Sequence, residues 1–326
     1  MQPGWVNAPR RAYMAVGAIA GGLMALGSLW LGPQPRSLGY APAPATVAAV
    51  PTSGVLRPAP LPLPTITARP EPPGERADWP TAVPDVALAL HPDGQARTAR
   101  VPILMYHYVA DTPAGADVYR RDLTVSVAAF EAQLAYLRAE GYTSITLAEL
   151  AQHLSEGRPL PENPIVLTFD DGYEDAFLYA FPLLRQYGFR GTFFVITEYL
   201  DQGLPGYLSW EQAALMLANG MEIGSHSVSH PDLRKLTQAE LEQEIAGSRR
   251  SIQERLNVPV RFFCYPSGRY DKRVIAALRA AGYWGATTTA GGIVQTTEHL
   301  FELRRVRVHG SGNVSQLHET LAYYGR

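Results

Sequence analysis

From Val101 onward, short apolar runs alternate with amphipathic stretches along the chain. Such short apolar runs predict buried strands, and the stretches between them have the spacing of helices. One of these stretches, SVAAFEAQLAYLRAEGY, predicts a helix with Ser126 as its N-cap and Gly141 as its stop. The expected strands are VPILMYHYV, TSIT, PIVLTF, GTFFVIT, MEIGSH, VRFFCYP, YWGATTT and ELRRVRV. Strands and helices that alternate in this way indicate parallel β/α units.

About eight such units between residues 100 and 326 favour a closed β/α barrel over an open doubly wound sheet. In a parallel barrel the chemistry gathers where the strands end and the loops begin. The candidate functional residues are therefore those that follow the carboxyl ends of the predicted strands.

The N-terminus contains an uncharged apolar stretch, residues 12–32, which is long enough to cross a bilayer as a helix. Arg10 and Arg11 precede it and predict that residues 1–11 stay in the cytoplasm. We therefore expect a single-pass anchor in the inner membrane, with the rest of the chain on the periplasmic side. The alternative is a cleaved signal peptide and a secreted protein, although the apolar run is longer than is usual for one.

Residues 33–99 are rich in proline and alanine, which is typical of an extended linker of low order. Residues 100–326 then form the one folded domain that the sequence predicts.

The composition of the chain excludes some classes of protein and site. The formal net charge is -2, from 28 basic and 30 acidic residues, so the chain lacks the basic surface of a nucleic-acid-binding protein. Its single cysteine, Cys264, excludes an intramolecular disulfide and a cysteine-rich zinc module. A lone thiol within FFCYP is interpreted as packing, with a nucleophile as the alternative.

Two strand ends carry groups that can bind a metal. LTFDDG ends one strand with Asp170 and Asp171, and EIGSHSVSH ends another with His226 and His230. An i, i+4 pair of histidines in one helical turn would present both rings to one ion. Two histidines and one aspartate leave a coordination position for water, as in catalytic zinc sites. The second aspartate would then act as a general base, and Gly172 would let the backbone turn sharply behind them.

Two other metal motifs do not fit. An EF-hand loop that began at Asp170 would need glycine at Asp175 and glutamate at Phe181. A zinc protease of the H-E-x-x-H type would need glutamate where Ser227 stands.

TFDDGY, SHSVSH and FFCYPSG resemble the motifs of the polysaccharide deacetylases, the NodB-homology or carbohydrate esterase family four, from Val101 to the C-terminus. The resemblance implies a distorted β/α barrel and a metal-dependent hydrolase of N-acetyl or O-acetyl groups on glycans. It implies Asp171, His226 and His230 as ligands of a divalent metal, usually zinc, and Asp170 as the base. It also implies an oxyanion-binding backbone N–H on Ser267. The same ligands suit Co²⁺, Ni²⁺ or Mn²⁺.

VPILMYHYV and GYTSITLAEL resemble the branch that contains poly-N-acetylglucosamine deacetylases. This branch takes its general-acid histidine from the first strand, which implies His107. His309 in VRVHGSG is the alternative, since the broader family takes its acid from a late motif. A histidine in an apolar strand can also be a hydrogen-bonded core residue.

The chain departs from the family pattern at two positions. Cys264 stands where many members have an arginine, and Ser267 stands where they have a tyrosine. We hypothesise that Arg305 in ELRRVRV supplies the missing positive charge to Asp170, because a guanidinium matches a carboxylate with two parallel bonds. In the alternative, Arg304, Arg305 and Arg307 are surface charges on a strand edge.

Aromatic residues near these motifs can line a sugar-binding groove. Tyr173 and Trp210 are the candidates we favour, and core packing is the alternative.

The sequence therefore predicts a membrane-tethered, metal-dependent enzyme that removes N-acetyl groups from an N-acetylglucosamine-containing polysaccharide. Peptidoglycan and O-acetylated glycans are the alternative substrates. A glycan-binding envelope protein without activity is the alternative of another class. Apart from the polymer and the membrane, the sequence indicates no partner.

Overall fold

A computed structural model describes residues 90–325 of the chain. The predicted cytoplasmic segment, the predicted anchor and most of the predicted linker lie outside the described residues. Among the helices of residues 90–325, none combines the length and the apolar character that a membrane crossing needs.

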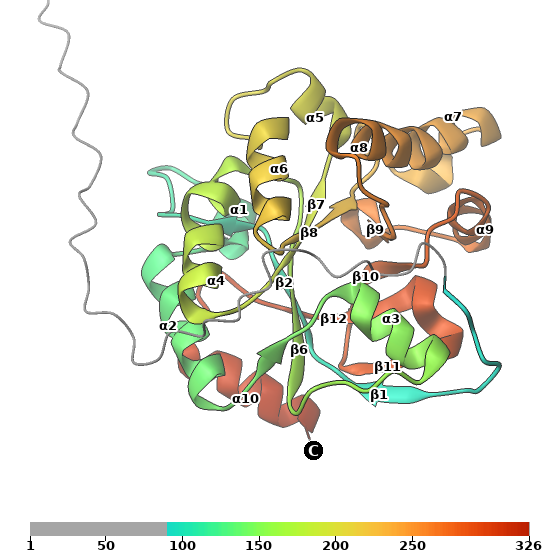
Figure 1. The fold of residues 1–326 in the computed structure, drawn as a ribbon. Coiled ribbons are helices and arrows are strands. Elements are labelled where there is room, and N and C mark those ends of the chain that lie inside the picture. The colour runs from blue at the N-terminus through green and yellow to red at the C-terminus, as the bar shows by residue number, and fades with distance from the viewer. Residues whose placement is uncertain (1–89, 326) are drawn as a thin grey trace, which may run out of the picture. The chain divides into compact units, whose positions relative to one another are not determined.

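The described part of the chain contains strands, α-helices and short 3-10 or π-helical turns (Figure 1). The strands are β1 (Thr98–Arg100), β2 (Ile103–Tyr106), β3 (Tyr108–Val109), β4 (Thr124–Val125), β5 (Thr143–Ser144), β6 (Pro164–Phe169), β7 (Thr192–Val195), β8 (Glu222–Ser225), β9 (Phe262–Cys264), β10 (Gly285–Gly291), β11 (Val294–Thr296) and β12 (Leu303–Arg307). The α-helices are α1 (Val118–Leu123), α2 (Val127–Ala139), α3 (Leu147–Glu156), α4 (Phe181–Tyr187), α5 (Thr197–Asp201), α6 (Trp210–Ala218), α7 (Gln238–Glu242), α8 (Ser248–Leu256), α9 (Lys272–Ala280) and α10 (Val314–Gly325). The turns are η1 (Ala176–Ala180), η2 (Leu233–Lys235), η3 (Gln243–Gly247), η4 (Pro266–Gly268) and η5 (Thr297–Glu302), of which η1 and η3 are π-helical.

Seven of the strands form a closed parallel barrel. They follow the order β2, β12, β10, β9, β8, β7 and β6, and β6 pairs with β2 to close the ring. The predicted β/α barrel is therefore correct in class. The predicted number of strands was slightly too high, because β5, the TSIT strand, pairs with β6 and stands outside the ring.

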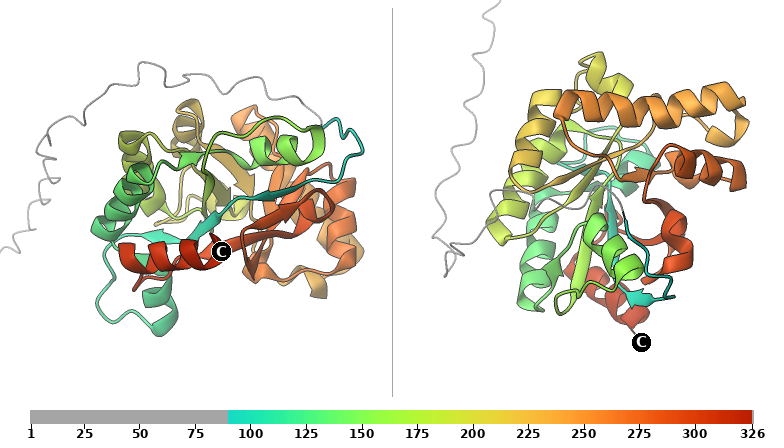
Figure 2. Two further views of the ribbon diagram at one scale, coloured as in Figure 1. Left: turned by 90° about the horizontal axis from the view of Figure 1, so that it is seen from below. Right: turned by 45° about the vertical axis from the view of Figure 1, so that its right-hand side comes forward.

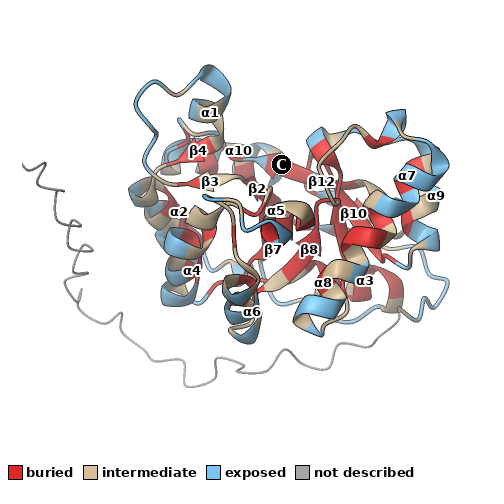
Figure 3. Cartoon of the chain, turned by 90° about the horizontal axis from the view of Figure 1, so that it is seen from above, coloured by how far each residue is buried: buried red, intermediate tan, exposed pale blue. Residues whose placement is uncertain are grey.

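The barrel strands are covered on both faces. All four residues of β2 are buried, and so are all residues of β7 and β9. Figure 3 shows these buried strands at the centre and helices around them whose outer faces are exposed. This arrangement explains why the strands read as continuous apolar runs instead of alternating patterns.

The helix signals in the sequence correspond to real caps. The Ser126 side chain accepts a bond from the backbone N–H of Ala129 at the start of α2. Gly141, the predicted stop, has φ +74°, a left-handed conformation that glycine adopts readily. Capping boxes start three further helices, α3, α6 and α7.

The folded domain begins earlier than expected. β1 pairs with β11 in an antiparallel ribbon, with Ala99 opposite Gln295. Before β1, the Asp93 backbone N–H donates to the carbonyl oxygen of Ser155 in α3. The last residues assigned to the linker, 93–99, therefore belong to the domain. Pairing with β11, about two hundred residues later, holds Thr98 and Ala99 in the domain.

Three consecutive helical segments, α7, η3 and α8, run on continuously from Gln238 to Leu256 (Figure 2). The π-helical turn η3 lies in the middle. Such turns are frequent at functional sites in proteins, and this one carries Glu244.

The strand register brings the candidate residues to one level of the barrel. Tyr106 at the end of β2 is opposite Phe169 at the end of β6, so His107 and Asp170 leave the barrel side by side. The Asp170 backbone N–H donates to the carbonyl oxygen of Tyr106 at 3.0 Å. On β8, Ser225 is opposite Val195, and His226 follows directly.

Candidate active site

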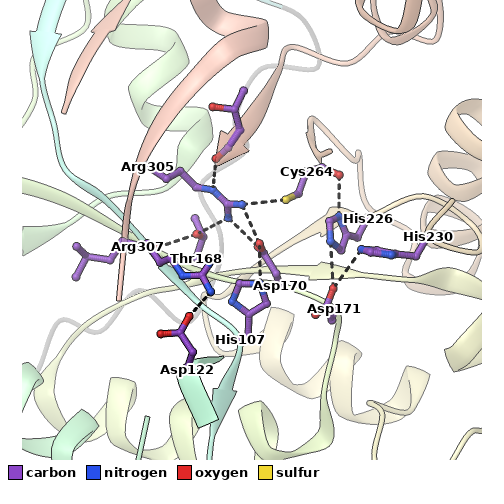
Figure 4. Close-up of polar contacts among 12 residues, drawn as sticks. His107, Asp122, Thr168, Asp170, Asp171, His226, His230, Cys264, Arg305 and Arg307 are labelled. Carbon is purple, nitrogen blue, oxygen red and sulfur yellow. Dashed lines mark hydrogen bonds and ion pairs between the residues drawn. The ribbon is translucent and has the colours of Figure 1, made fainter. Parts of the chain in front are cut away.

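Asp171, His226 and His230 converge in a cluster suited to a metal ion (Figure 4). Asp171 Oδ1 lies 3.2 Å from Nε2 of His226 and 3.6 Å from Nε2 of His230. Ligand atoms about 2 Å from a tetrahedral zinc are about 3.3 Å from each other. The three side chains therefore fit a divalent metal, and their donor set matches the one predicted from the sequence.

The route by which the histidines meet differs from the prediction. His226 and His230 lie on a loop after β8 and not on one turn of a helix. Ser227 and His230 take left-handed backbone conformations, with φ of 69° and 62°. These turns bring the rings together with their centroids 4.7 Å apart. A helical interpretation of the i, i+4 spacing was wrong, because residues 226–230 form a loop in which Ser227 and His230 are left-handed.

Several residues with strained, left-handed backbone conformations lie in and around this cluster. Six described residues other than glycine have positive φ, and four of them, Asp171, Ser227, His230 and Ser267, lie in the predicted site motifs. Each such conformation costs of order 1–3 kcal/mol and persists only where its surroundings enforce it. Gly172, at φ +72°, makes the predicted turn, and an added Cβ would lie 3.3 Å from Val195.

Asp170 forms a buried ion pair with Arg305. Nη1 and Nη2 of Arg305 each donate to one carboxylate oxygen at 2.8 Å, and the two side chains are only 1% and 3% exposed. Arg305 Nε also donates to the carbonyl oxygen of Thr288 at 2.8 Å. The surface-charge alternative therefore does not hold for Arg305, although Arg304 and Arg307 are exposed.

This ion pair keeps Asp170 charged. Burial by itself would raise the pKa of Asp170, but the Arg305 guanidinium outweighs it and holds the pKa well below the ordinary range. Asp170 is thus an ionised carboxylate beside the metal cluster. That is the form that can accept a proton.

His107 is a second neighbour of Asp170, with its Nε2 3.8 Å from Asp170 Oδ2. Burial lowers the pKa of His107, and the charges of Asp170 and Asp171 oppose the shift in part. With a lowered pKa the ring is mostly neutral near pH 7, so it must take up a proton before it can act as an acid. His309 is 55% exposed, and its Nδ1 bonds to Asp122 at 2.8 Å. The contact with Asp170 favours His107 over His309 as the acid.

We expect His107→Ala to reduce turnover by about 100-fold or more, because a positioned acid contributes at least that much. His309→Ala should keep turnover within a few-fold of the wild type. The measurement is the rate of acetate release at saturating acetylated glycan. Full activity in His107→Ala together with loss in His309→Ala would reverse the assignment.

Cys264 and Ser267 complete the described site. The Cys264 thiol is buried and accepts a bond from Arg305 Nη2 at 3.3 Å, so it packs against the ion pair. The carbonyl oxygen of Cys264 accepts from Nδ1 of His226 at 2.7 Å, which leaves Nε2 to face Asp171. Ser267 is exposed in turn η4 at the end of β9, with φ 53°. Its role in binding an oxyanion stays a prediction.

A second possible cluster, Asp170, His226 and Cys264, is also within ligand distance. Both oxygens of Asp170 already accept bonds from Arg305. Asp171, whose carboxylate faces the two histidines, is therefore the better third ligand.

The aromatic candidates have different surroundings. Tyr173 stacks on Tyr108 with ring centroids 3.7 Å apart and lies 5.2 Å from the ring of Tyr207. Trp210 donates its indole N–H to Asp201, and Arg255 lies over its ring. Tyr173 thus belongs to an aromatic stack that adjoins Asp171, whereas Trp210 contacts polar surface residues.

Tyr108 and Asp122 also contact candidate residues, although neither was among the residues predicted from the sequence. Tyr108 directly follows His107, and this adjacency could have indicated it. Asp122 contacts His309 and Arg307 from α1, and no motif marks it.

The chain is similar to known polysaccharide deacetylases. A family model for polysaccharide deacetylases matches residues 157–286. YxkH of Bacillus subtilis, itself assigned to the polysaccharide deacetylases, is 31% identical over 65% of this chain and 72% of its own. Poly-beta-1,6-N-acetyl-D-glucosamine N-deacetylase of Escherichia coli is 32% identical over 30% of this chain, which spans only 14% of that enzyme.

A solved structure has the same fold. The Streptococcus pyogenes deacetylase PplD in complex with acetate superposes with a TM-score of 0.64 and 28% identity, covering 69% of this chain and 99% of that one. The chain belongs to the polysaccharide deacetylase family.

Proposed function

We propose that the chain is a metal-dependent hydrolase that removes N-acetyl groups from an N-acetylglucosamine-containing polysaccharide. The observation that carries the proposal is the cluster of Asp171, His226 and His230 beside the buried Asp170–Arg305 pair. The similarity to a poly-N-acetylglucosamine deacetylase supports the choice of substrate.

In the proposed reaction, water adds to the acetyl carbonyl carbon and the bond from that carbon to nitrogen breaks. A bound divalent metal supplies a Lewis acid and a lowered pKa for water. Asp170, held ionised by Arg305, takes a proton from the attacking water. The backbone N–H of Ser267 donates to the oxyanion that forms.

His107 then gives a proton to the departing nitrogen, which leaves as the free amine of the sugar, and acetate is the second product. The position of His107 next to Asp170 supports this role, since the proton donor and the proton acceptor must act at the same acetamide group. Tyr173 is proposed to line the groove that holds the sugar ring, and Trp210 a more distant part of it.

Zinc is the metal we propose first, because two imidazoles and one carboxylate form a common catalytic zinc site. Co²⁺, Ni²⁺ and Mn²⁺ suit the same ligands, so availability decides among them.

We further propose that residues 12–32 anchor the enzyme in the inner membrane and that the domain works on the periplasmic side. Cell fractionation tests this directly. Recovery of the full-length chain with the inner membrane supports it, and recovery of a shortened soluble chain outside the cytoplasm supports cleavage instead.

We expect acetate release from poly-N-acetylglucosamine to stop when a chelator removes the metal and to return when Zn²⁺ is added back. The panel should include peptidoglycan and an O-acetylated glycan, with free amines and acetate measured in parallel. Release from one of the other polymers alone would change the substrate and keep the chemistry. No metal-dependent release from any of them would favour a glycan-binding protein without activity.

A further inference from the structure

The metal-ligating loop, Ser227 to His230, is held by a side chain that comes from a distant helix. Glu244 in turn η3 accepts bonds from two consecutive backbone N–H groups, those of Val228 at 2.8 Å and Ser229 at 2.9 Å, through Oε2. Its other oxygen, Oε1, accepts from the Ser229 hydroxyl at 2.6 Å. The carboxylate thus bonds three donors of a loop between two proposed ligands.

The opposite side of this loop is bound by the backbone. The N–H groups of Thr197 and Glu198 in the first turn of α5 donate to the carbonyl oxygens of Ser227 and Val228. The loop carbonyls therefore have partners from α5, whereas the loop N–H groups need an acceptor. Glu244 supplies that acceptor, and leaving these donors without a partner would cost about 1–3 kcal/mol each.

The loop needs such support because its backbone is strained. Ser227 and His230 are both left-handed, and His230 N–H donates to the Ser227 hydroxyl at 2.9 Å. Strain of this kind persists only where contacts enforce it. Without Glu244, the loop loses its three bonds at Val228 and Ser229, the two residues that connect the left-handed Ser227 and His230. The His230 ring is then no longer held in its place opposite Asp171.

The same helix also supports the start of the loop. Ser248, four residues after Glu244, bonds to the Ser225 hydroxyl at 2.7 Å, and that hydroxyl accepts from the Ser227 N–H. Ile245 is buried in the core and fixes the helix in place. The π-helical turn therefore lies on a rigid element and presents Glu244 to the loop.

We propose that Glu244 is a positioning residue that preorganises His226 and His230 for metal binding. The inference rests on the proposed metal site. It adds that a side chain in contact with neither the metal nor the substrate sets the affinity of the site. Residues that orient metal ligands typically change affinity by about 10–100-fold when they are removed.

The test measures the affinity of the metal-free full chain for Co²⁺ and Zn²⁺ by competition with a chelating dye. We expect Glu244→Ala to weaken Co²⁺ binding by about 10–100-fold. Glu244→Gln should stay within a few-fold of the wild type, because its amide oxygen can accept both N–H groups and its NH₂ can donate to Ser229. A large loss in this variant would contradict a role based on loop geometry.

Glu240 provides the matched control, because it lies on the same helix and accepts bonds from the Thr237 N–H and hydroxyl at 2.8 Å each. Glu240→Ala should lower the melting temperature and leave the Co²⁺ affinity unchanged, since its partners lie at the start of α7. If Glu244→Ala binds Co²⁺ as tightly as Glu240→Ala, the positioning role is wrong.

Two further variants keep the test decisive. Ser229→Ala removes one of the three bonds and should weaken Co²⁺ binding by a few-fold, even if Glu244→Ala fails to fold; unchanged affinity would count against the role. Asp171→Ala separates this inference from the proposed function. If Asp171→Ala loses metal binding and Glu244→Ala keeps it unchanged, only the role of Glu244 is rejected. If Asp171→Ala still binds the metal tightly, the metal site itself is rejected.

Discussion

Asp170→Asn is expected to abolish acetate release while the protein still binds its metal. The substitution keeps the shape of the side chain but removes the negative charge that we propose accepts a proton from water. A positioned base contributes about 100- to 10,000-fold to a rate, so the remaining turnover should be at most about a hundredth of the wild-type value. The measurement pairs acetate release at saturating glycan with metal content per chain.

Metal retention makes this result specific. Asp171, His226 and His230 are unchanged in Asp170→Asn, so the Co²⁺ affinity should stay within a few-fold of the wild type. Asp171→Asn is the matched comparison. It alters the neighbouring carboxylate, a proposed metal ligand, and should bind Co²⁺ more weakly than Asp170→Asn does. Turnover in Asp170→Asn above about a tenth of the wild type would assign the base elsewhere.

The sequence was sufficient to predict the parallel barrel and the residues that meet at its end. The reason is local: an apolar run followed by Asp170 and Asp171 shows both where a strand ends and what it carries. Because parallel strands end at the same side of a barrel, groups that follow different strands come together. This rule alone predicts that the Asp motif and the His motif lie close together, even when the conformations of the loops are unknown.

The loop conformations could not be predicted in the same way. His226 and His230 have helical spacing in the sequence, yet the left-handed residues Ser227 and His230 form a loop instead. The loop in that conformation is bonded by Glu244 and by the first turn of α5, which lie outside the His motif and are marked by no motif of their own. Tertiary contacts of this kind override the local pattern.

Arg305 is an intermediate case. Its pairing with Asp170 could be hypothesised because Cys264 stands where many family members have arginine, and the charge of the base needs a partner. The sequence did not show that Arg305 would be 1% exposed with each guanidinium nitrogen bonded. β12 lies between β10 and β2 in the ring, and from this strand the buried Arg305 side chain reaches Asp170 at the end of β6.

Arg305→Met should therefore destabilise the fold and impair turnover together. Removing one partner of a buried ion pair leaves an uncompensated charge and costs about 3–5 kcal/mol. The free energy of unfolding of the metal-free protein, from urea titration at pH 7, should fall by this amount. Turnover should fall as well, because burial without Arg305 raises the pKa of Asp170 and less of it remains ionised.

The pH dependence of this loss has a definite sign. In the wild type the pKa of Asp170 is depressed in the folded state, so the ion pair stabilises the fold above the unfolded pKa of about 4. That contribution fades as the pH falls through the folded pKa. The difference in stability between the wild type and Arg305→Met should therefore narrow from pH 7 toward pH 3. A constant difference would mean that lost packing, and not lost charge pairing, accounts for the effect.

A double variant tests whether the position of the arginine matters or only its charge. The Cys264 thiol lies 3.3 Å from Arg305 Nη2, so an arginine at position 264 starts beside the same carboxylate. Cys264→Arg combined with Arg305→Met returns the charge to the place where many family members have it, and it should recover part of both stability and turnover. Cys264→Arg alone should destabilise the fold, since two guanidinium groups would then compete for Asp170. If the double variant is no better than the sum of the two single variants, the energetic link between these positions and Asp170 is absent.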